Sequence, residues 1–373
     1  MIVGTPKEIK DNERRVGLVP GSVHELTRRG HQVIVESGAG IGAGIADDQY
    51  IAAGAEIVAT AEEVFVRAQL IVKVKEPLAI ERKRLKRGQI LFTYLHLAPD
   101  VEQTRDLIDS GAICIAYETV TSPRGALPLL TPMSEVAGRL APQVGARALE
   151  ASAGGRGVLL GGVPGVAPAD VVILGGGVSG THAAIIALGM GADVTVLDRS
   201  ADVLKRVAVE FSGRVRTVFS NSANIARYAA RADLLIGTVL IPGAAAPKLI
   251  TREIVKSMKP GSVIVDISID QGGCAETSRP TTHSSPTYVE HGVIHYCVTN
   301  MPGAVARTST FALNNVTLPF TLALADKGWR QALIDDKHLA AGLNVAEGRV
   351  TCEPVAAAQG LAYVPVGEVL AEL

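Results

Sequence analysis

The stretch from Asp170 to Asp198 constrains the fold of this chain more than any other segment. An apolar strand is predicted over residues 171–174, a helix that starts at the following turn is predicted to run through 182–188, and a second strand over 193–197 ends at Asp198. The turn, residues 175–180, reads GGGVSG and fits the spacing G-x-G-x-x-G. A strand, a turn, a helix and a second strand in this order form one βαβ unit of a parallel sheet.

The three glycines at the fixed positions of this pattern each have a structural role in a dinucleotide-binding site. Gly175 makes the tight turn, Gly177 lets the backbone approach a pyrophosphate, and Gly180 lets the helix pack on the strand. The helix N-terminus offers N–H groups to the phosphates. Asp198 can accept both ribose hydroxyls, and its charge would repel the 2′-phosphate of NADP. The segment therefore predicts a site for NAD.

The glycine spacing alone is weak, and its context gives it weight. Glycine makes up 39 of 373 residues, so three fixed glycines would occur by chance roughly 0.4 times in such a chain. The preceding strand and the terminal acid favour a nucleotide site over an ordinary βαβ turn. A second glycine-rich segment, residues 38–44, follows a strand at 32–36, but no clear helix follows it and no acid ends the next apolar run. We interpret this segment as a flexible surface loop.

Length and composition set the broad class of the protein. A chain of 373 residues exceeds one ordinary core, so about two domains are expected. Hydrophobic residues make up 47%, charged residues 20%, and the net charge is −1, which describes a globular protein and argues against nucleic acid as a partner. The densest basic run, residues 82–87, is interpreted as a solvated helix face. No run of 18 apolar residues predicts a membrane span, and no signal peptide precedes the first strand.

The cysteines bear on the compartment. Four of them lie far apart without C-x-x-C spacing: Cys114, Cys274, Cys297 and Cys352. Scattered cysteines argue against a disulfide framework or a zinc site. We therefore expect reduced thiols and a cytoplasmic protein.

Strand-like apolar runs alternate with helical patterns along the first third of the chain. The predicted strands cover residues 2–4, 32–36, 55–58, 70–74, 89–93 and 112–116, and the predicted helices cover 22–29, 61–67 and 101–110. Such alternation predicts a mostly parallel sheet with helices on both faces.

A new unit is predicted to begin at Thr131, a candidate N-cap followed by Pro132. Its first helix is expected over residues 134–151, with Pro142 as a candidate kink. Later predicted strands cover 214–219, 234–237, 263–267 and 294–297, and helices are expected over 309–318 and 319–328.

The predicted fold class is α/β, with two doubly wound parallel-sheet domains. A Rossmann NAD-binding domain, residues 131–303, is expected to be inserted in a flavodoxin-like substrate (catalytic) domain, residues 1–130 and 304–373.

Polar side chains follow several of these strands, where ligands bind in open α/β sheets. Arg15 lies in the loop after the first strand, Lys75 directly follows 70–74, His96 lies just past 89–93, and Asp270 follows 263–267 in the second unit. Arg suits a carboxylate and Lys a carboxylate or carbonyl oxygen. His exchanges protons near neutral pH, and Asp can orient ammonia or water. If the two sheet edges face each other, the four residues suit oxidation of a small 2-amino or 2-hydroxy acid.

Each of these residues also has a simpler interpretation. Arg15 follows Glu13 and could form a surface ion pair with it. Lys75 could be solvated, and His96 could be a core histidine with satisfied hydrogen bonds. Asp270 could cap the turn at 271–273. The shared sheet edge carries the functional hypothesis, rather than any single residue.

Several longer runs resemble the bacterial L-alanine dehydrogenase family over essentially the whole chain. They cover residues 4–8 (GTPKE), 13–16 (ERRV), 73–77 (KVKEP), 155–165 (GRGVLLGGVPG), 240–244 (LIPGA), 266–274 (DISIDQGGC) and 295–305 (HYCVTNMPGAV). The resemblance implies NAD-dependent, reversible oxidative deamination of L-alanine to pyruvate and ammonia. It further implies a homo-oligomer, typically a hexamer, and a role in amino-acid catabolism, and no membrane partner is expected.

The resemblance also implies roles for individual residues. Arg15 and Lys75 would bind the substrate carboxylate and keto oxygen, and His96 and Asp270 would be catalytic, handling protons at the imine and carbinolamine steps. Positions that match the family's NAD site, together with the glycines of the turn, are Ser134, Val178, Asp198, Ser220, Val239, Leu240, Ile267, Asp270, Arg279, Val298, Asn300 and Met301.

The chain departs from the family pattern at three places. Val203 stands where a Lys or Arg near the adenosine ribose is expected. Ala323 and Lys327 stand where some relatives have a magnesium-binding Glu and His, so no metal is predicted there. His182 stands in place of an Asn and is expected to face outward.

Other functions remain open on the sequence. One is the NAD-binding subunit of a proton-translocating transhydrogenase, against which His96 with Lys75 and the lack of a membrane segment argue. Another is a saccharopine- or opine-type dehydrogenase. A third, of a different class, is a catalytically silent NAD sensor, which would not need Arg15, Lys75, His96 and Asp270 together.

Overall fold

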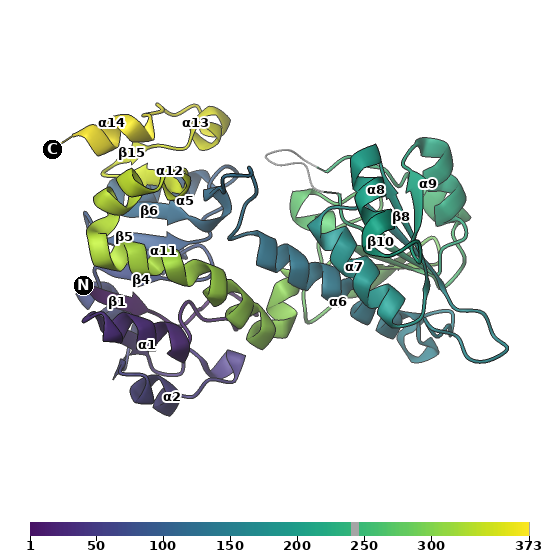
Figure 1. Ribbon diagram of the computed structural model, residues 1–373, viewed down its shortest axis with the longest axis horizontal. Helices are drawn as coiled ribbons and strands as arrows, with labels where there is room; N and C mark the ends of the chain where they lie inside the picture. Colours follow the sequence, from purple (N-terminus) through teal and green to yellow (C-terminus); the bar gives the residue numbers. More distant parts are fainter. Residues whose placement is uncertain (240–245, 373) are drawn as a thin grey trace. The chain divides into compact units, whose positions relative to one another are not determined.

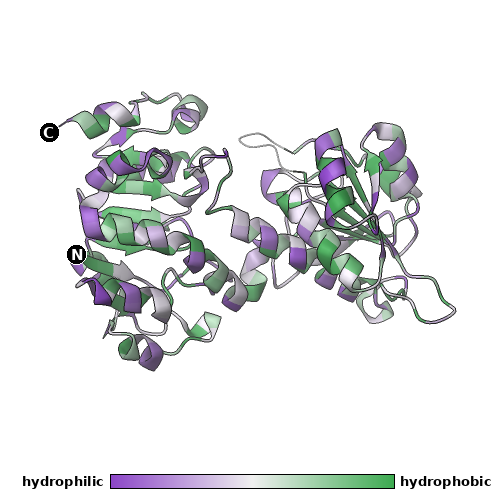
Figure 2. Cartoon of the chain, in the orientation of Figure 1, coloured by the Kyte–Doolittle hydropathy of each residue, from purple (hydrophilic) through white to green (hydrophobic). Residues whose placement is uncertain are grey.

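The computed structural model describes residues 1–239 and 246–372, and it divides into two compact units (Figure 1). The first unit comprises Met1–Met133 and Val305–Leu373, and the second comprises Ser134–Ala304. Each unit is built around its own sheet, and Figure 2 shows apolar residues concentrated on the strands of both sheets. In the described part of the chain, no helix combines the length and apolarity needed to cross a bilayer.

The sheet of the first unit has eight strands in the order β15-β14-β6-β5-β4-β1-β2-β3. The strands are β1 (Ile2–Thr5), β2 (Gln32–Glu36), β3 (Glu56–Val58), β4 (Leu70–Val72), β5 (Ile90–Thr93), β6 (Ile113–Ala116), β14 (Leu343–Ala346) and β15 (Arg349–Val350). Strands β1 to β6 are parallel, whereas β14 and β15 join antiparallel. Apart from the short edge strand β3, the parallel order is the 2-1-3-4-5 of flavodoxin-like sheets.

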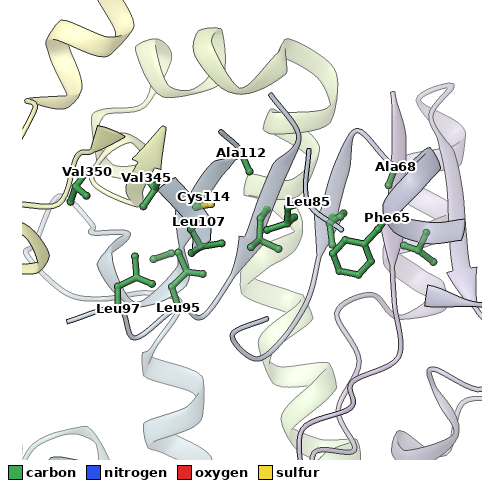
Figure 3. Close-up of a cluster of buried hydrophobic side chains, with 14 of the residues drawn as sticks. Phe65, Ala68, Leu85, Leu95, Leu97, Leu107, Ala112, Cys114, Val345 and Val350 are labelled. Atoms are coloured by element: carbon green, nitrogen blue, oxygen red, sulfur yellow. The ribbon is translucent and has the colours of Figure 1, made fainter. Parts of the chain in front are cut away.

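Helices enclose this sheet. They are α1 (Pro20–Arg28), α2 (Asp47–Ala52), α3 (Ala61–Arg67), α4 (Ala79–Arg82), α5 (Val101–Ser110), α11 (Ala306–Asp335), α12 (Lys337–Ala340), α13 (Glu353–Gln359) and α14 (Val366–Ala371). Figure 3 shows Phe65 of α3 and Leu107 of α5 in one apolar cluster with Cys114 of β6 and Val345 of β14. Strands, helices and loops all contribute buried side chains to this cluster, so hydrophobic burial holds the helices against the sheet.

The sheet of the second unit has seven strands in the order β12-β13-β11-β10-β7-β8-β9. They are β7 (Asp170–Leu174), β8 (Asp193–Asp198), β9 (Arg216–Phe219), β10 (Leu234–Gly237), β11 (Val263–Asp266), β12 (Thr287–Glu290) and β13 (Val293–Tyr296). Without the antiparallel edge strand β12, the order is the 3-2-1-4-5-6 of the Rossmann fold, and it reverses between β7 and β10. The prediction of an α/β protein with two doubly wound sheets is therefore confirmed.

The helices of the second unit are α6 (Thr131–Leu149), α7 (Val178–Gly189), α8 (Ala201–Glu210), α9 (Ser222–Ala229) and α10 (Arg252–Ser257). Short 3₁₀ turns, η2 (Tyr117–Thr119) in the first unit and η4 (Ile267–Gln271) in the second, follow β6 and β11. Both turns lie at carboxyl ends of parallel strands, which is where the candidate site residues also lie.

Two predictions about helices were wrong. The helices expected over 309–318 and 319–328 form one helix, α11, in which Pro319 is internal and the non-helical residue is Gly328, with φ 74°. Thr131 does not precede the helix as an N-cap, because α6 begins at Thr131 itself, and its hydroxyl donates to the Leu127 carbonyl (2.9 Å).

The segment at residues 38–44 also differs from its prediction. A 3₁₀ turn (Ile41–Ala43) and then α2 follow the glycines, and Ala39 and Ala43 are buried. Arg307 of α11 donates to the carbonyls of Ala43 (3.0 Å) and Gly44 (3.1 Å). The loop is thus tied into the first unit by hydrogen bonds and burial that no local pattern signals.

The basic run at 82–87 is not a uniformly solvated helix face. Arg82 is 7% exposed and pairs with Asp106 (2.6 Å) and Glu102 (3.0 Å) of α5. Only Arg82 of this run belongs to a helix, α4. Its guanidinium cross-links α4 to α5, so its role in the first unit is structural.

Candidate functional site

The glycine turn of the second unit lies between β7 and α7, at the point where the strand order reverses. Gly175 has φ 103°, which favours glycine. A Cβ on Gly180 would lie 1.8 Å from the Gly175 carbonyl oxygen, whereas a Cβ on Gly177 would have nothing within 4 Å. The backbone is therefore tightly packed at Gly180, where α7 contacts the turn. At Gly177, beside the N-terminus of α7, there is space for a ligand. This geometry fits a bound pyrophosphate.

Asp198 ends β8 and faces the same turn. Its Oδ2 accepts from the Gly176 N–H (2.7 Å) and its Oδ1 from the Ser200 N–H (2.8 Å). A carboxylate has about four lone-pair sites, so these two bonds hold Asp198 in place while leaving acceptor capacity for ribose hydroxyls. The backbone around the turn thus orients the acid that the sequence singles out.

Helix α8 supplies a basic residue that the sequence reasoning missed. Val203 packs against the turn, since a Cβ on Gly176 would lie 2.6 Å from Val203 Cγ1. One helical turn later, Arg206 donates through Nη2 to the Gly176 carbonyl and, at 3.3 Å, to the Thr181 hydroxyl. The i, i+3 spacing on one helix face is a signal that could have identified Arg206.

The remaining predicted cofactor residues lie in loops of the second unit. Ser134 accepts at its carbonyl from Ser179 (2.9 Å), Ser220 follows β9 and its N–H bonds the Asp198 carbonyl (2.9 Å), and the Val239 carbonyl accepts from Ser268 (2.8 Å). Val178 begins α7, Ile267 and Asp270 lie in η4, and Val298, Asn300 and Met301 follow β13. Leu240 lies outside the described residues. Most of these positions follow carboxyl ends of parallel strands, as a Rossmann ligand requires.

Arg279 is held by an aromatic stack. Its guanidinium lies 3.9 Å from the ring centroid of Tyr288, and that ring stacks on His295 (5.0 Å, 16°). The Tyr288 hydroxyl accepts from the Arg279 N–H (2.8 Å) and donates to the Thr277 carbonyl (2.7 Å). Burial lowers the pKa of His295, so this ring is neutral and does not repel the arginine.

The loop that carries Asp270 is fixed by a different acid. Asp266, fully buried at the end of β11, accepts from Ser268 N (3.1 Å), Cys274 N (2.8 Å) and the Ser278 hydroxyl (2.6 Å). Asp270 itself is exposed. Asp266 therefore caps η4 and holds the Cys274 N–H after the glycines, a role that the sequence reasoning did not assign to it.

Arg15 of the first unit forms an ion pair that is buried rather than on the surface. Its Nε and Nη2 donate to the two oxygens of Glu13 (2.7 and 2.6 Å), its Nη1 donates to the Met133 sulfur (3.0 Å), and it is 2% exposed. Burial alone would lower the pKa of Arg15, but the hydrogen bonds and charge of Glu13 raise it. Arg15 is thus a fixed cation inside the protein.

Lys75 and Lys73 lie two residues apart after β4, in very different surroundings. The Lys73 ammonium is fully buried between Glu81 (2.7 Å) and Glu8 (3.1 Å). The Lys75 side chain is 15% exposed, and its Nζ lies 3.8 Å from Glu76. Glu8 also accepts from the Val74 and Lys75 N–H groups (2.7 and 3.2 Å), so the buried charges fix the backbone that presents Lys75.

His96 is not a core histidine, because its side chain is 47% exposed. It has φ 51°, a left-handed conformation that is uncommon outside glycine. Its ring stacks on Tyr94 (5.8 Å, 7°), and the Tyr94 hydroxyl donates to the Leu129 carbonyl (2.5 Å). Burial raises the pKa of Tyr94 despite the nearby charge of Arg15, so the ring that stacks on His96 is uncharged.

Three of the four predicted chemical residues share one edge of a sheet. Arg15, Lys75 and His96 follow β1, β4 and β5, which are neighbours in the order β5-β4-β1. Asp270 follows β11 in the other unit. The first edge offers two cations and an imidazole to a ligand, a combination that suits an anion next to a group that gains or loses a proton.

His182 and Lys327, two positions where the chain departs from the expected pattern, have identifiable contacts. His182 does not face outward, because its Nδ1 accepts from Arg139 of α6 (2.9 Å) and its side chain is 20% exposed. Lys327 pairs with Asp335 (2.6 Å) within α11. Within residues 1–239 and 246–372, no three His, Cys, Asp or Glu side chains gather as a metal site would require.

These features define the class of the protein. A glycine turn at the switch point of a Rossmann sheet, an acid at the end of the next strand, and a second α/β unit with a charged strand edge are the parts of a dinucleotide-dependent dehydrogenase.

Comparison with known proteins gives the family. Residues 4–137 match the N-terminal domain, and residues 141–353 the C-terminal domain, of the alanine dehydrogenase/PNT family. Alanine dehydrogenase of Halomonas elongata is 58% identical over 99% of this chain and 100% of its own. A solved L-alanine dehydrogenase is 52% identical, with a TM-score of 0.93 and full coverage of both chains. A transhydrogenase from Sinorhizobium meliloti is 28% identical, with a TM-score of 0.82, over 95% of this chain and 99% of its own. The chain belongs to the alanine dehydrogenase/PNT family.

Proposed function

We propose that this chain is an NAD-dependent L-alanine dehydrogenase, which reversibly converts L-alanine and water to pyruvate and ammonia. The observation that carries the proposal is the placement of Arg15, Lys75 and His96 after three neighbouring strands in a member of this family. These groups match a small substrate with a carboxylate beside an amine or carbonyl. The high identity to named alanine dehydrogenases over the full chain supports the same choice.

Substrate binding follows from the contacts of the two cations. We propose that the substrate carboxylate displaces the Met133 sulfur from Arg15 Nη1, because a carboxylate is a far better acceptor than a thioether. Glu13 holds the guanidinium plane fixed during this exchange. Lys75 then faces the keto oxygen of pyruvate, or the corresponding group of alanine, and stabilises negative charge there.

Proton transfer falls to His96 and Asp270. NAD bound in this site would supply the hydride acceptor for C2 of alanine, and loss of the hydride leaves the substrate as a protonated imine. Water adds to this imine to give a carbinolamine, which loses ammonia to give pyruvate. We propose that His96 takes up the proton released by the attacking water, and that Asp270 orients water and the departing ammonia.

Asp198 supports NAD rather than NADP as the cofactor. Its carboxylate is fixed by Gly176 N and Ser200 N and would repel a 2′-phosphate. Arg206 does not reverse this preference in our proposal, because it is engaged by the Gly176 carbonyl and by Glu210 (3.0 Å). From the family resemblance we also propose a cytoplasmic homohexamer that serves amino-acid catabolism, for which sedimentation velocity tests the assembly.

The direct test is NAD reduction by the purified protein across a panel of small amino and 2-hydroxy acids. We expect L-alanine to give NADH, with the highest kcat/KM of the panel. His96→Ala should lower turnover by about 10²–10⁴-fold and leave NAD binding near normal, while the exposed His24→Ala should retain turnover. If L-alanine gives no NADH, or no more than the other acids of the panel, the proposed function is refuted.

The likeness to a transhydrogenase favours one rival function, that of an NAD-binding subunit without an amino-acid site. The same assay separates the two functions. Such a subunit would bind NADH and give no NADH from any amino acid, and Arg15→Ala would not change its nucleotide binding.

A further inference from the structure

The backbone at His96 is strained, and side chains from several elements hold it. With φ 51°, His96 occupies a left-handed conformation that a non-glycine residue keeps only when its surroundings impose it. The adjoining carbonyls are bonded from two helices. Gln103 of α5 donates to the Leu95 carbonyl (2.5 Å), and Gln359, the last residue of α13, donates to the Leu97 carbonyl (2.7 Å).

The amide side of the same loop is held by one carboxylate. Glu118 lies in η2, just after β6, the strand next to β5. Its Oε1 accepts from the His96 N–H (2.6 Å) and from the Leu95 N–H (3.1 Å), and its Oε2 lies 3.2 Å from the Leu95 N. The Glu118 side chain is 16% exposed, so water competes little for these bonds.

Glu118 also faces the imidazole itself. Its Oε1 lies 3.9 Å from His96 Nδ1, which is near the ring but too long for a hydrogen bond. Two bonded N–H groups and one nearby ring nitrogen therefore meet at a single carboxylate oxygen. The Tyr94 ring stacked on His96 limits where the imidazole can turn.

We propose that Glu118 is a positioning residue for the reaction, which holds the His96 backbone in its left-handed conformation and so aims the imidazole at the substrate. The inference rests on the proposed function of His96 as the group that exchanges protons. Glu118 acts through His96 and touches neither substrate nor cofactor in this account. A misplaced general base loses much of its effect, because proton transfer depends on reach and angle.

The test compares three variants in steady-state alanine oxidation and pyruvate reduction. Glu118→Ala removes all three contacts and should lower kcat by about 10- to 100-fold, with KM for alanine and the Kd of NADH within about 2-fold of wild type. Glu118→Gln keeps one oxygen for the two shared N–H bonds and should recover part of this loss. Glu102→Ala removes an equal charge from an exposed side chain of the same unit and should retain full turnover.

The outcomes separate this inference from the proposed function. Wild-type turnover in Glu118→Ala, with His96→Ala inactive, would overturn the role of Glu118 and leave the proposed function standing. A wild-type protein with no alanine-dependent NADH formation would instead overturn the proposed function. If Glu118→Ala does not fold, Glu118→Gln decides: a lowered kcat at unchanged KM and melting temperature supports positioning, and wild-type kcat contradicts it.

Discussion

Lys73 and Lys75 lie two positions apart. The structure predicts that the same substitution lowers stability at Lys73 and activity at Lys75. Lys73→Met should destabilise the first unit, because Glu8 and Glu81, each 2% exposed at the side chain, would lose the ammonium between them. Lys75→Met should leave stability within about 1 kcal/mol of wild type, since its nearest anion is 3.8 Å away and Glu76 also pairs with Lys10. The activity loss should fall on Lys75→Met.

The loss of unfolding free energy in Lys73→Met can be estimated, because Glu8 and Glu81 must either stay charged without a partner or take up a proton. Removing one member of a buried ion pair costs about 3–5 kcal/mol. Taking up a proton is the alternative, and for a carboxyl with the ordinary value of 4.5 this costs roughly 3 kcal/mol at pH 7. The two estimates of the lost unfolding free energy, for an unpaired charge and for proton uptake, therefore agree. For a folding unit of about 150–250 residues, this lowers the melting temperature by roughly 6–20 °C.

The pH dependence gives a second check on the same variant. Burial already raises the pKa of Glu8 in the wild type, with Lys73 opposing the rise. Without Lys73 the folded-state value rises further, so the variant binds protons more tightly when folded. The contribution of Glu8 to the variant's stability is then full below about pH 4.5 and is lost as pH rises through the folded-state pKa.

The assay is urea unfolding of both variants at pH 5 and pH 7, followed by far-UV circular dichroism. The gap between Lys73→Met and wild type should be smaller at pH 5 than at pH 7. A Lys73→Met protein within 1 kcal/mol of wild type at pH 7, or a gap that widens at pH 5, would refute the claim of a buried ion cluster.

Three further predictions concern the second unit. Asp198→Ala should weaken NAD binding and reduce discrimination against NADP, as fluorescence titration with NADH and NADPH would reveal; an unchanged ratio moves that role elsewhere. Tyr288→Leu should weaken NADH binding by about 3- to 30-fold by releasing Arg279, whereas Tyr288→Phe, which keeps the ring, should lose less; equal losses contradict the ring's role. Because burial lowers the pKa of His295, wild-type stability is full above about pH 6.5 and falls as pH drops through the folded-state pKa. His295→Phe should flatten this slope in urea midpoints at pH 7.5 and 5.5, and parallel slopes would rule the residue out.

The parts of the fold that depend on local pattern could be predicted from the sequence. The strands at 32–36, 70–72 and 234–237 consist largely of buried apolar residues, and the glycine turn with its terminal acid needs only one short segment to be recognised. The strands that were missed are short: β12 and β15 are edge strands, and β14 lies next to the edge, between β15 and β6. Their strand character depends on partners distant in the sequence.

The site was predictable only to the level of strand ends. Arg15, Lys75 and His96 could be named as candidates because each follows a strand of the same parallel sheet, and their roles stay predictions. Glu8 and Glu118 were missed because their importance comes from contacts 66 and 22 positions away, with Val74 and His96 respectively. A charged residue in or beside an apolar strand, as Lys73 is, was the available signal that a buried partner must exist.

The central proposal is that this chain oxidises L-alanine with NAD, the hydride passing directly from C2 of alanine to the nicotinamide. The most direct measurement is a single turnover with [2-²H]-L-alanine and NAD, followed by mass spectrometry of the dinucleotide. The account predicts that the reduced nicotinamide carries the deuterium. Deuterium recovered in solvent, or no label transfer by a protein that binds NADH, would contradict it.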